Sequence, residues 1–132
     1  MNEPPGVPKI LIVDDDVGLV WWLGELFHEA GYQSLPALGG RQALALVRRN
    51  RADVDLLIVN PGLSGVPGLI ETLSRRRSPK VVFIAGPRAG AIPGVHPVAT
   101  LERPSGWEPI SRFEWRQKLQ GILKAVGFRA AS

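Results

Sequence analysis

Three consecutive aspartates follow the first apolar run of the chain, and their side chains are the most distinctive chemical groups in the sequence. The run Lys9 to Val13 reads K-I-L-I-V, and Asp14, Asp15 and Asp16 come directly after it. Carboxylates gathered at a strand end repel one another unless a divalent cation or a basic side chain offsets their charge. The cluster therefore predicts either a hard-metal site, such as one for Mg²⁺, or an ion pair with a basic group.

Several other kinds of chemistry are disfavoured by what the sequence lacks. It contains neither G-x-G-x-x-G nor a phosphate loop ending in Gly-Lys-Ser/Thr, the glycine-rich patterns that cradle nucleotide phosphates. The absence of cysteine removes disulfides, thiolate metal sites and cysteine nucleophiles. His28 and His96 stand isolated, without a ligand pair or a catalytic partner, so we assign neither a role.

The elements that must position the acids follow from an alternation of apolar runs with helical periodicity, the pattern of a parallel sheet covered on both faces. Strands are expected near 9–13, 33–38, 55–59, 80–85 and 98–102, and helices between the first two strands, at 40–49, at 67–77 and from Pro109. Residues 86–97 contain three glycines and three prolines, which leave no room for a stable helix. The fourth crossover should therefore be a loop or a single turn.

The chain carries a net charge of +4 and two arginine clusters, at 48–51 and 75–77. A basic surface is one signature of a nucleic-acid binder. Both clusters fall at expected helix ends, where cations complement the helix dipole, and no aromatic residues alternate with them to stack bases. Solvated helix ends are the preferred interpretation, and a basic nucleic-acid-binding module remains the alternative.

With 132 residues, the chain is expected to fold around one core, from 9 to 127, between flexible tails at 1–8 and 128–132. No apolar run reaches the roughly 18 residues typical of a membrane span. The first residues also lack the basic and apolar segments of a signal peptide. A cytoplasmic protein without membrane contact is predicted.

Together the run I-L-I-V-D-D-D over 10–16, the helix end at Ala30-Gly31-Tyr32 and the segment from Asp55 to Asn60 resemble the receiver domain of two-component response regulators. The resemblance implies a single doubly wound (βα)₅ flavodoxin-like domain with its parallel strands in the order 2-1-3-4-5, here with the fourth helix shortened or replaced by a loop. In that family two acids after the first strand help to hold Mg²⁺, and an aspartate ending the third strand accepts a phosphoryl group. A Ser or Thr ends the fourth strand, and Lys-Pro ends the fifth.

Carried over to this sequence, the family pattern is only partly kept. Asp14 and Asp15 match the acidic pair, but the phosphoacceptor position falls on Asn60, Ala85 stands where the switch hydroxyl belongs, and Arg103 replaces the lysine. A carboxamide is a poor nucleophile and supplies no charge to a metal. We expect Asn60 to hydrogen-bond across the site and Arg103 to offset the charge of the acids.

The resemblance and the three replaced positions predict an atypical receiver, or pseudo-receiver, that is not an enzyme and acts by protein-protein interaction. No cofactor is expected; the acids are treated as vestigial metal ligands, and residual Mg²⁺ binding stays open. One rival is a receiver that is still phosphorylated, for example on Ser64. The expected partner is another signalling protein, such as a histidine kinase or an output protein. Homodimerisation is left open, and nucleic acid is disfavoured.

A docking surface is predicted where the missing fourth helix would uncover the sheet edge near Val98 and the last helix. Exposed apolar surface in a globular domain generally has a function. The interaction residues expected there are Trp107, Ile92, Arg112 and Arg116. Trp107 has a second interpretation as a plug of the core, and Trp21, on the outer face of the first helix, is the competing docking point.

Overall fold

Five parallel strands form one sheet in this computed structural model, which describes residues 8–50, 53–85, 92–102 and 112–127. The strands are β1 (Lys9–Val13), β2 (Gln33–Ala37), β3 (Leu56–Val59), β4 (Lys80–Ile84) and β5 (Ala99–Leu101). Their order across the sheet is β2-β1-β3-β4-β5, and every neighbouring pair is parallel. The predicted fold class and strand order are confirmed.

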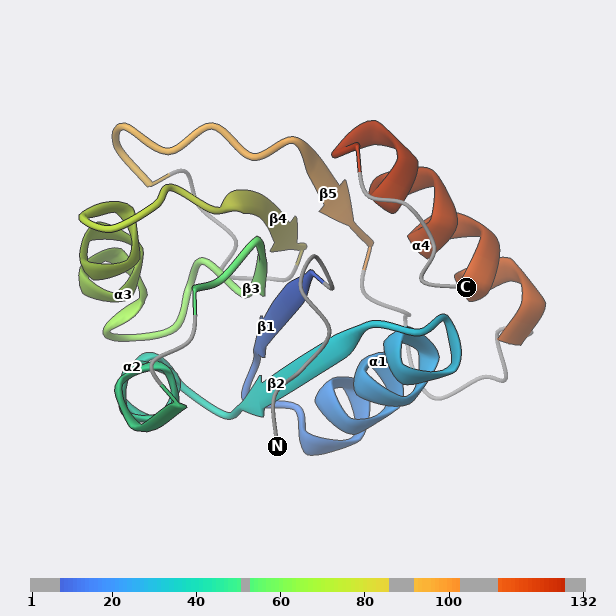
Figure 1. Cartoon of the computed structure of the whole chain (residues 1–132), viewed down its shortest axis with the longest axis horizontal. Helices are drawn as coiled ribbons and strands as arrows, with labels where there is room; N and C mark the ends of the chain where they lie inside the picture. Colours follow the sequence, from blue (N-terminus) through green and yellow to red (C-terminus); the bar gives the residue numbers. More distant parts are fainter. Residues whose placement is uncertain (1–7, 51–52, 86–91, 103–111, 128–132) are drawn as a thin grey trace.

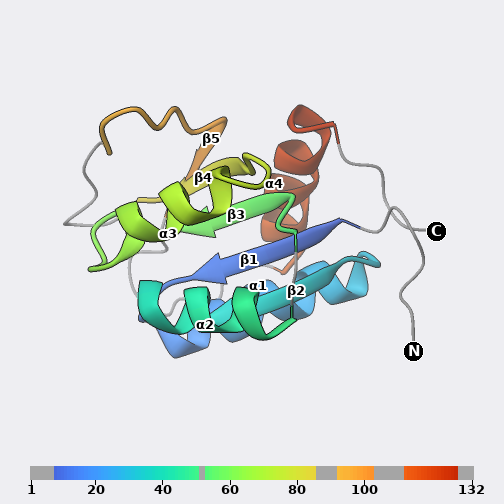
Figure 2. The ribbon, with the colours of Figure 1, turned by 60° about the vertical axis from the view of Figure 1, so that its left-hand side comes forward.

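Helices cover both faces of this sheet (Figures 1 and 2). They are α1 (Val17–Glu29), α2 (Gly40–Asn50), α3 (Val66–Ser74) and α4 (Arg112–Ala125). The side chains of α1 and α4 pack on one face, and those of α2 and α3 pack on the other. None of the helices within the described residues is both long enough and apolar enough to span a bilayer.

Alternate residues of the central strands point into two separate cores. Ile10 and Ile12 of β1 face α1 and α4, whereas Leu11 and Val13 face α2 and α3. All four are fully buried, which explains why the first strand reads as a continuous apolar run instead of an alternating one. The strand that carries the acids is thus fixed on both sides.

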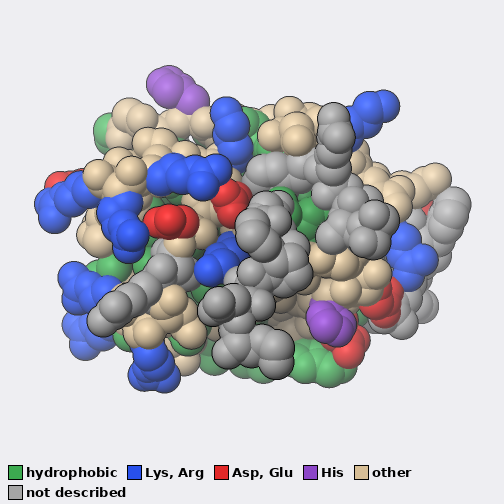
Figure 3. Space-filling view, in the orientation of Figure 1, with side chains coloured by type: hydrophobic (Ala, Val, Ile, Leu, Met, Phe, Trp, Pro, Cys, Tyr) green, Lys and Arg blue, Asp and Glu red, His purple; other side chains and the backbone are tan. Residues whose placement is uncertain are grey.

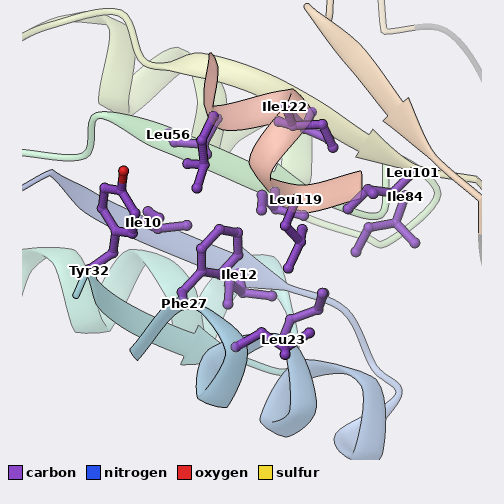
Figure 4. Packing of buried hydrophobic residues seen from close by; sticks show 14 of the residues in the cluster. Ile10, Ile12, Leu23, Phe27, Tyr32, Leu56, Ile84, Leu101, Leu119 and Ile122 are labelled. Carbon is purple, nitrogen blue, oxygen red and sulfur yellow. The ribbon is translucent and has the colours of Figure 1, made fainter. Parts of the chain in front are cut away.

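The core beneath α1 and α4 is built from large side chains that meet over β1. Figure 4 shows Leu23 and Phe27 of α1 and Leu119 of α4 converging on Ile12. Full burial of such a side chain contributes roughly 1.5–3 kcal/mol relative to leaving it exposed. This packing holds the two helices that flank the carboxyl end of β1.

Helix α3 ends at Ser74, three residues before the predicted end at Arg77. The backbone N–H groups of Arg76 and Arg77 still reach the carbonyl of Leu73, but their side chains turn toward aspartates that precede β3. The prediction extended the helix because the sequence pattern cannot show ion pairs with residues more than 20 positions away.

The fourth crossover contains no helix in its described part, Ala85 and residues 92–98. A turn at Pro93 and Gly94 follows Ile92, and the φ of Gly94 is 80°, a conformation that suits glycine. The expected shortening of the fourth helix agrees with these residues, and residues 86–91 lie outside the described chain.

Candidate functional site

The candidate site lies at the carboxyl edge of the sheet, where three strands end side by side. Asp14 follows β1, Asn60 follows β3 and Ala85 follows β4. Strand register places Val13 beside Val59, and the N–H of Asn60 donates to the carbonyl of Val13 at 2.9 Å. The sequence-predicted positions 14, 60 and 85 are therefore brought to one edge, the edge at which open α/β sheets bind ligands.

Asp14 is fully buried at this edge. Its Oδ1 accepts a hydrogen bond from the backbone N–H of Asp16 at 2.8 Å. Removing a carboxylate from water costs several kcal/mol unless hydrogen bonds or opposite charges compensate. Asp14 thus holds the turn from β1 into α1 with a side chain that solvent does not reach.

The other two aspartates, Asp15 and Asp16, differ in exposure and in role. Asp15 is exposed, whereas Asp16 is the N-cap of α1, with its Oδ1 accepting from the N–H of Leu19 at 3.2 Å. Sequence reasoning treated the three acids as one charge cluster and missed this cap. The signal was available, since an aspartate immediately before an apolar-periodic run is a recognised helix start.

Replacing the N-cap should separate the structural role of Asp16 from that of its exposed neighbour. Asp16→Ala is expected to lower the free energy of unfolding by about 1 kcal/mol, because the N–H of Leu19 loses its partner. Asp15→Ala is the matched control and should change it by less than about 0.5 kcal/mol. Urea denaturation followed by circular dichroism measures both, and equal losses would contradict the assignment.

Asn60 occupies the phosphoacceptor-equivalent position and forms a local turn. Its Oδ1 accepts from the backbone N–H of Gly62 at 2.9 Å, the bond of an Asx turn. The expectation that this amide would bond across the site was wrong, because the side chain turns back into its own loop. The side-chain oxygen at this position is a neutral amide oxygen already engaged by the backbone.

The two remaining positions of the family pattern are Ala85 and Arg103. Ala85 is partly buried, has no hydroxyl, and is held by its N–H donating to the carbonyl of Leu101 at 2.8 Å. Arg103 lies outside the described residues, so its pairing with the acids stays a prediction. Within the described residues, no three His, Cys, Asp or Glu side chains are grouped as metal ligands.

The docking surface predicted near the fourth crossover needs correction. Ile92 is only 8% exposed and packs in the core beneath α2 and α3, so it is not an interaction residue. Arg116 is paired with Glu29 of α1, Nη2 to Oε2 at 2.8 Å. Val98 is exposed as expected. Trp107 and the side chain of Arg112 lie outside the described part of the structure.

Trp21, the competing docking point, is 65% exposed on the outer face of α1. It borders a groove of about 430 Å³ between α1 and β2. The groove is also lined by Val20, Gly24, Glu25, His28, Glu29, Ser34 and Pro36. The 100° spacing of helical residues correctly predicted that Trp21 is exposed. Trp21 is an accessible aromatic side chain beside a groove.

Comparison with known proteins agrees with the sequence resemblance. No family model matches the chain. Sporulation initiation phosphotransferase F of Bacillus subtilis is 46% identical over 67 residues, 50% of each protein. The chain thus matches half or less of the length of the curated relatives.

Solved structures share the fold over nearly the whole chain. The signal receiver domain of an HD domain-containing protein from Pseudomonas fluorescens superposes with a TM-score of 0.68 at 23% identity, covering 96% of this chain and 90% of that one. Chemotaxis response regulator CheY4 of Vibrio cholerae gives 0.64 at 20% identity, covering 91% and 98%.

The curated relatives and the structural neighbours are CheY-like receiver domains of response regulators, and the chain shares their fold. Receiver domains are modules of two-component signalling. This chain differs from the pattern of that class at the phosphoacceptor position, where Asn60 stands, and at the switch position, where Ala85 stands.

Proposed function

We propose that this chain is an atypical receiver that works in two-component or phosphorelay signalling by contacting another protein, without aspartyl phosphorylation. The observation that carries the proposal is the Asn60 carboxamide at the end of β3, whose oxygen caps Gly62. Acyl phosphate formation needs a carboxylate nucleophile, and an amide oxygen cannot serve as one.

The other groups at this edge support the same proposal. Ala85 offers no hydroxyl to receive a phosphoryl oxygen. A hard cation prefers several oxygen ligands, and the acids here divide into buried Asp14, exposed Asp15 and the helix cap Asp16. We propose that the acids are kept for the fold instead of for Mg²⁺, with Arg103 as their counter-charge.

A surface for the partner is proposed on α1, around Trp21. Exposed aromatic side chains next to a groove are typical anchors of protein interfaces. The partner is another signalling protein, such as a histidine kinase or an output protein. Trp21→Ala should abolish its binding and leave folding unchanged, as judged by calorimetry and circular dichroism.

Phosphate transfer from a histidine donor distinguishes this proposal from a receiver modified elsewhere. Ser64 is exposed in the loop after Asn60 and is the candidate for such modification. Incubation with a phosphorylated histidine kinase should leave the chain unlabelled. A label that is lost in Ser64→Ala but kept in Asn60→Ala would overturn the proposal in favour of the rival.

Restoring the acid alone should not restore switching. Asn60→Asp returns a nucleophile, but Ala85 still lacks a hydroxyl and the described part of the fourth crossover has no helix to reposition. Backbone NMR shifts across residues 85 and 92–102 should stay within a line width when beryllofluoride and Mg²⁺ are added to this variant. Large changes there would show that the switch survives.

A further inference from the structure

A second groove lies between α2 and α3, at the opposite end of the sheet from Asn60. It has a volume of about 250 Å³ and lies beside the residues that lead into β3. Its lining residues are Leu44, Val47, Arg48, Asp53, Val54, Thr72, Leu73, Arg76 and Arg77. Figure 3 shows Lys and Arg side chains gathered on the side of the molecule where α2 and α3 lie.

The groove combines an apolar floor with a basic rim. Leu44, Val47 and Leu73 supply the floor, and all three pack against the core beneath α2 and α3. Among the residues that the structure describes, three arginines and one aspartate supply its charged groups. An apolar floor with excess positive charge is complementary to a segment that carries an apolar side chain next to carboxylates.

The three arginines differ in how firmly they are held. Arg77 pairs with the largely buried Asp55 at 2.9 Å, and Arg76 pairs with Asp53 at 3.5 Å between two exposed side chains. Arg48 is exposed and forms no ion pair with any residue that the structure describes. Its guanidinium is therefore available to bind a carboxylate through two hydrogen bonds.

We propose that the groove between α2 and α3 binds a short acidic segment of a partner protein. An apolar anchor of that segment enters the floor formed by Leu44, Val47 and Leu73, and a neighbouring Asp or Glu pairs with Arg48. Arg76 is a second contact, because its long, exposed pair with Asp53 is worth little in water.

Other occupants fit the groove less well. Its volume lies below the roughly 300–1,000 Å³ of small-molecule sites, so it suits one anchoring side chain better than a whole ligand. A single-stranded nucleic acid would need aromatic side chains for base stacking, and none is among the described residues that line the groove. Phosphate groups are polar and would not be stabilised by contact with the apolar floor.

This inference goes beyond the proposed function and does not depend on it. The groove lies by Val54, at the start of β3, whereas Asn60 lies at the end of the same strand. Binding there can hold or fail whether or not the domain accepts a phosphoryl group. It would give the receiver a second partner surface, separate from Trp21.

Fluorescence anisotropy with a labelled ten-residue peptide tests the proposal. The probe carries two leucines one helical turn apart, flanked by four glutamates. Two control peptides replace either the leucines by serines or the glutamates by glutamines, and a ten-nucleotide single-stranded DNA serves as the polyanion control. The probe should bind the full chain tighter than all three controls.

Arg48→Ala and Arg49→Ala form a matched pair of variants. Both arginines are exposed neighbours on α2 and both changes remove one positive charge, but only Arg48 lines the groove. Arg48→Ala should weaken probe binding by about fivefold, the worth of one exposed charged pair, and Arg49→Ala by less than about twofold.

Each remaining outcome would overturn the proposal. Absence of probe binding would show that the groove does not bind such a segment. Equal binding of the serine peptide or the DNA would show that binding there is only general charge attraction. Equal losses in the Arg48 and Arg49 variants would place the probe outside the groove. If a second copy of the chain displaces the probe, the occupant is this protein and not a partner.

Discussion

Trp115→Ala is expected to lower the free energy of unfolding by about 3–5 kcal/mol, the usual cost of removing a large buried aromatic side chain. Trp115 of α4 is fully buried, and its ring contacts Trp22 of α1 edge to face, with centroids 5.0 Å apart. Lys118 lies over the same ring at 5.5 Å. The pair of tryptophans joins the two helices that cover one face of the sheet.

Two further variants make this prediction specific. Trp115→Phe keeps an aromatic ring and removes an indole N–H that has no hydrogen-bond partner among the described residues, so its loss of unfolding free energy should be clearly smaller. Trp21→Ala removes an exposed tryptophan and should change stability by less than about 0.5 kcal/mol. Urea denaturation gives all three values. A loss below 1 kcal/mol for Trp115→Ala would contradict the packing of α4.

Gly40→Ala should destabilise the chain by about 1–3 kcal/mol, the range expected when an added methyl group has no space. A Cβ at Gly40, the first residue of α2, would lie 2.6 Å from the carbonyl carbon of Gly65. Gly65 belongs to the loop that follows Asn60, and its φ of 81° is itself typical of glycine. Either α2 or this loop must move.

The same substitution elsewhere should have the opposite sign. Gly121 lies inside α4, and a Cβ there would meet no atom of the described residues within 4 Å. Gly121→Ala should therefore stabilise the chain by about 0.5–1 kcal/mol through helix propensity alone. Thermal denaturation compares the two variants. If Gly40→Ala is as stable as the parent chain, the loop after Asn60 is not held by α2 as described.

The sheet and its helices could be predicted because their signals are local. The apolar run before Asp14 and the glycine after α1 mark element ends, and the 100° spacing separates exposed Trp21 from buried Leu23. Each of these depends on residues within a few positions of one another. The structure confirms them, with element boundaries that differ from the predicted ones by at most three residues.

The wrong predictions concern features that a local sequence pattern cannot show, namely the direction of a side chain and its contacts with distant residues. The Gly- and Pro-rich stretch has no periodicity, so nothing in it showed that Ile92 points into the core. The pairs of Arg76 with Asp53 and of Arg77 with Asp55 join distant positions that only the folded chain brings together. Asn60 was placed on the correct edge, but the direction of its side chain depends on the turn it forms with Gly62.

Intact mass spectrometry after incubation with acetyl phosphate and Mg²⁺ tests the central claim most directly, with a receiver that retains the acceptor aspartate as the positive control. The Asn60 amide predicts that the chain keeps its unmodified mass while the control gains one phosphoryl group. A stable gain of one phosphoryl group by this chain, lost on substitution of Asp14 or Asp15, would contradict the account of an atypical receiver.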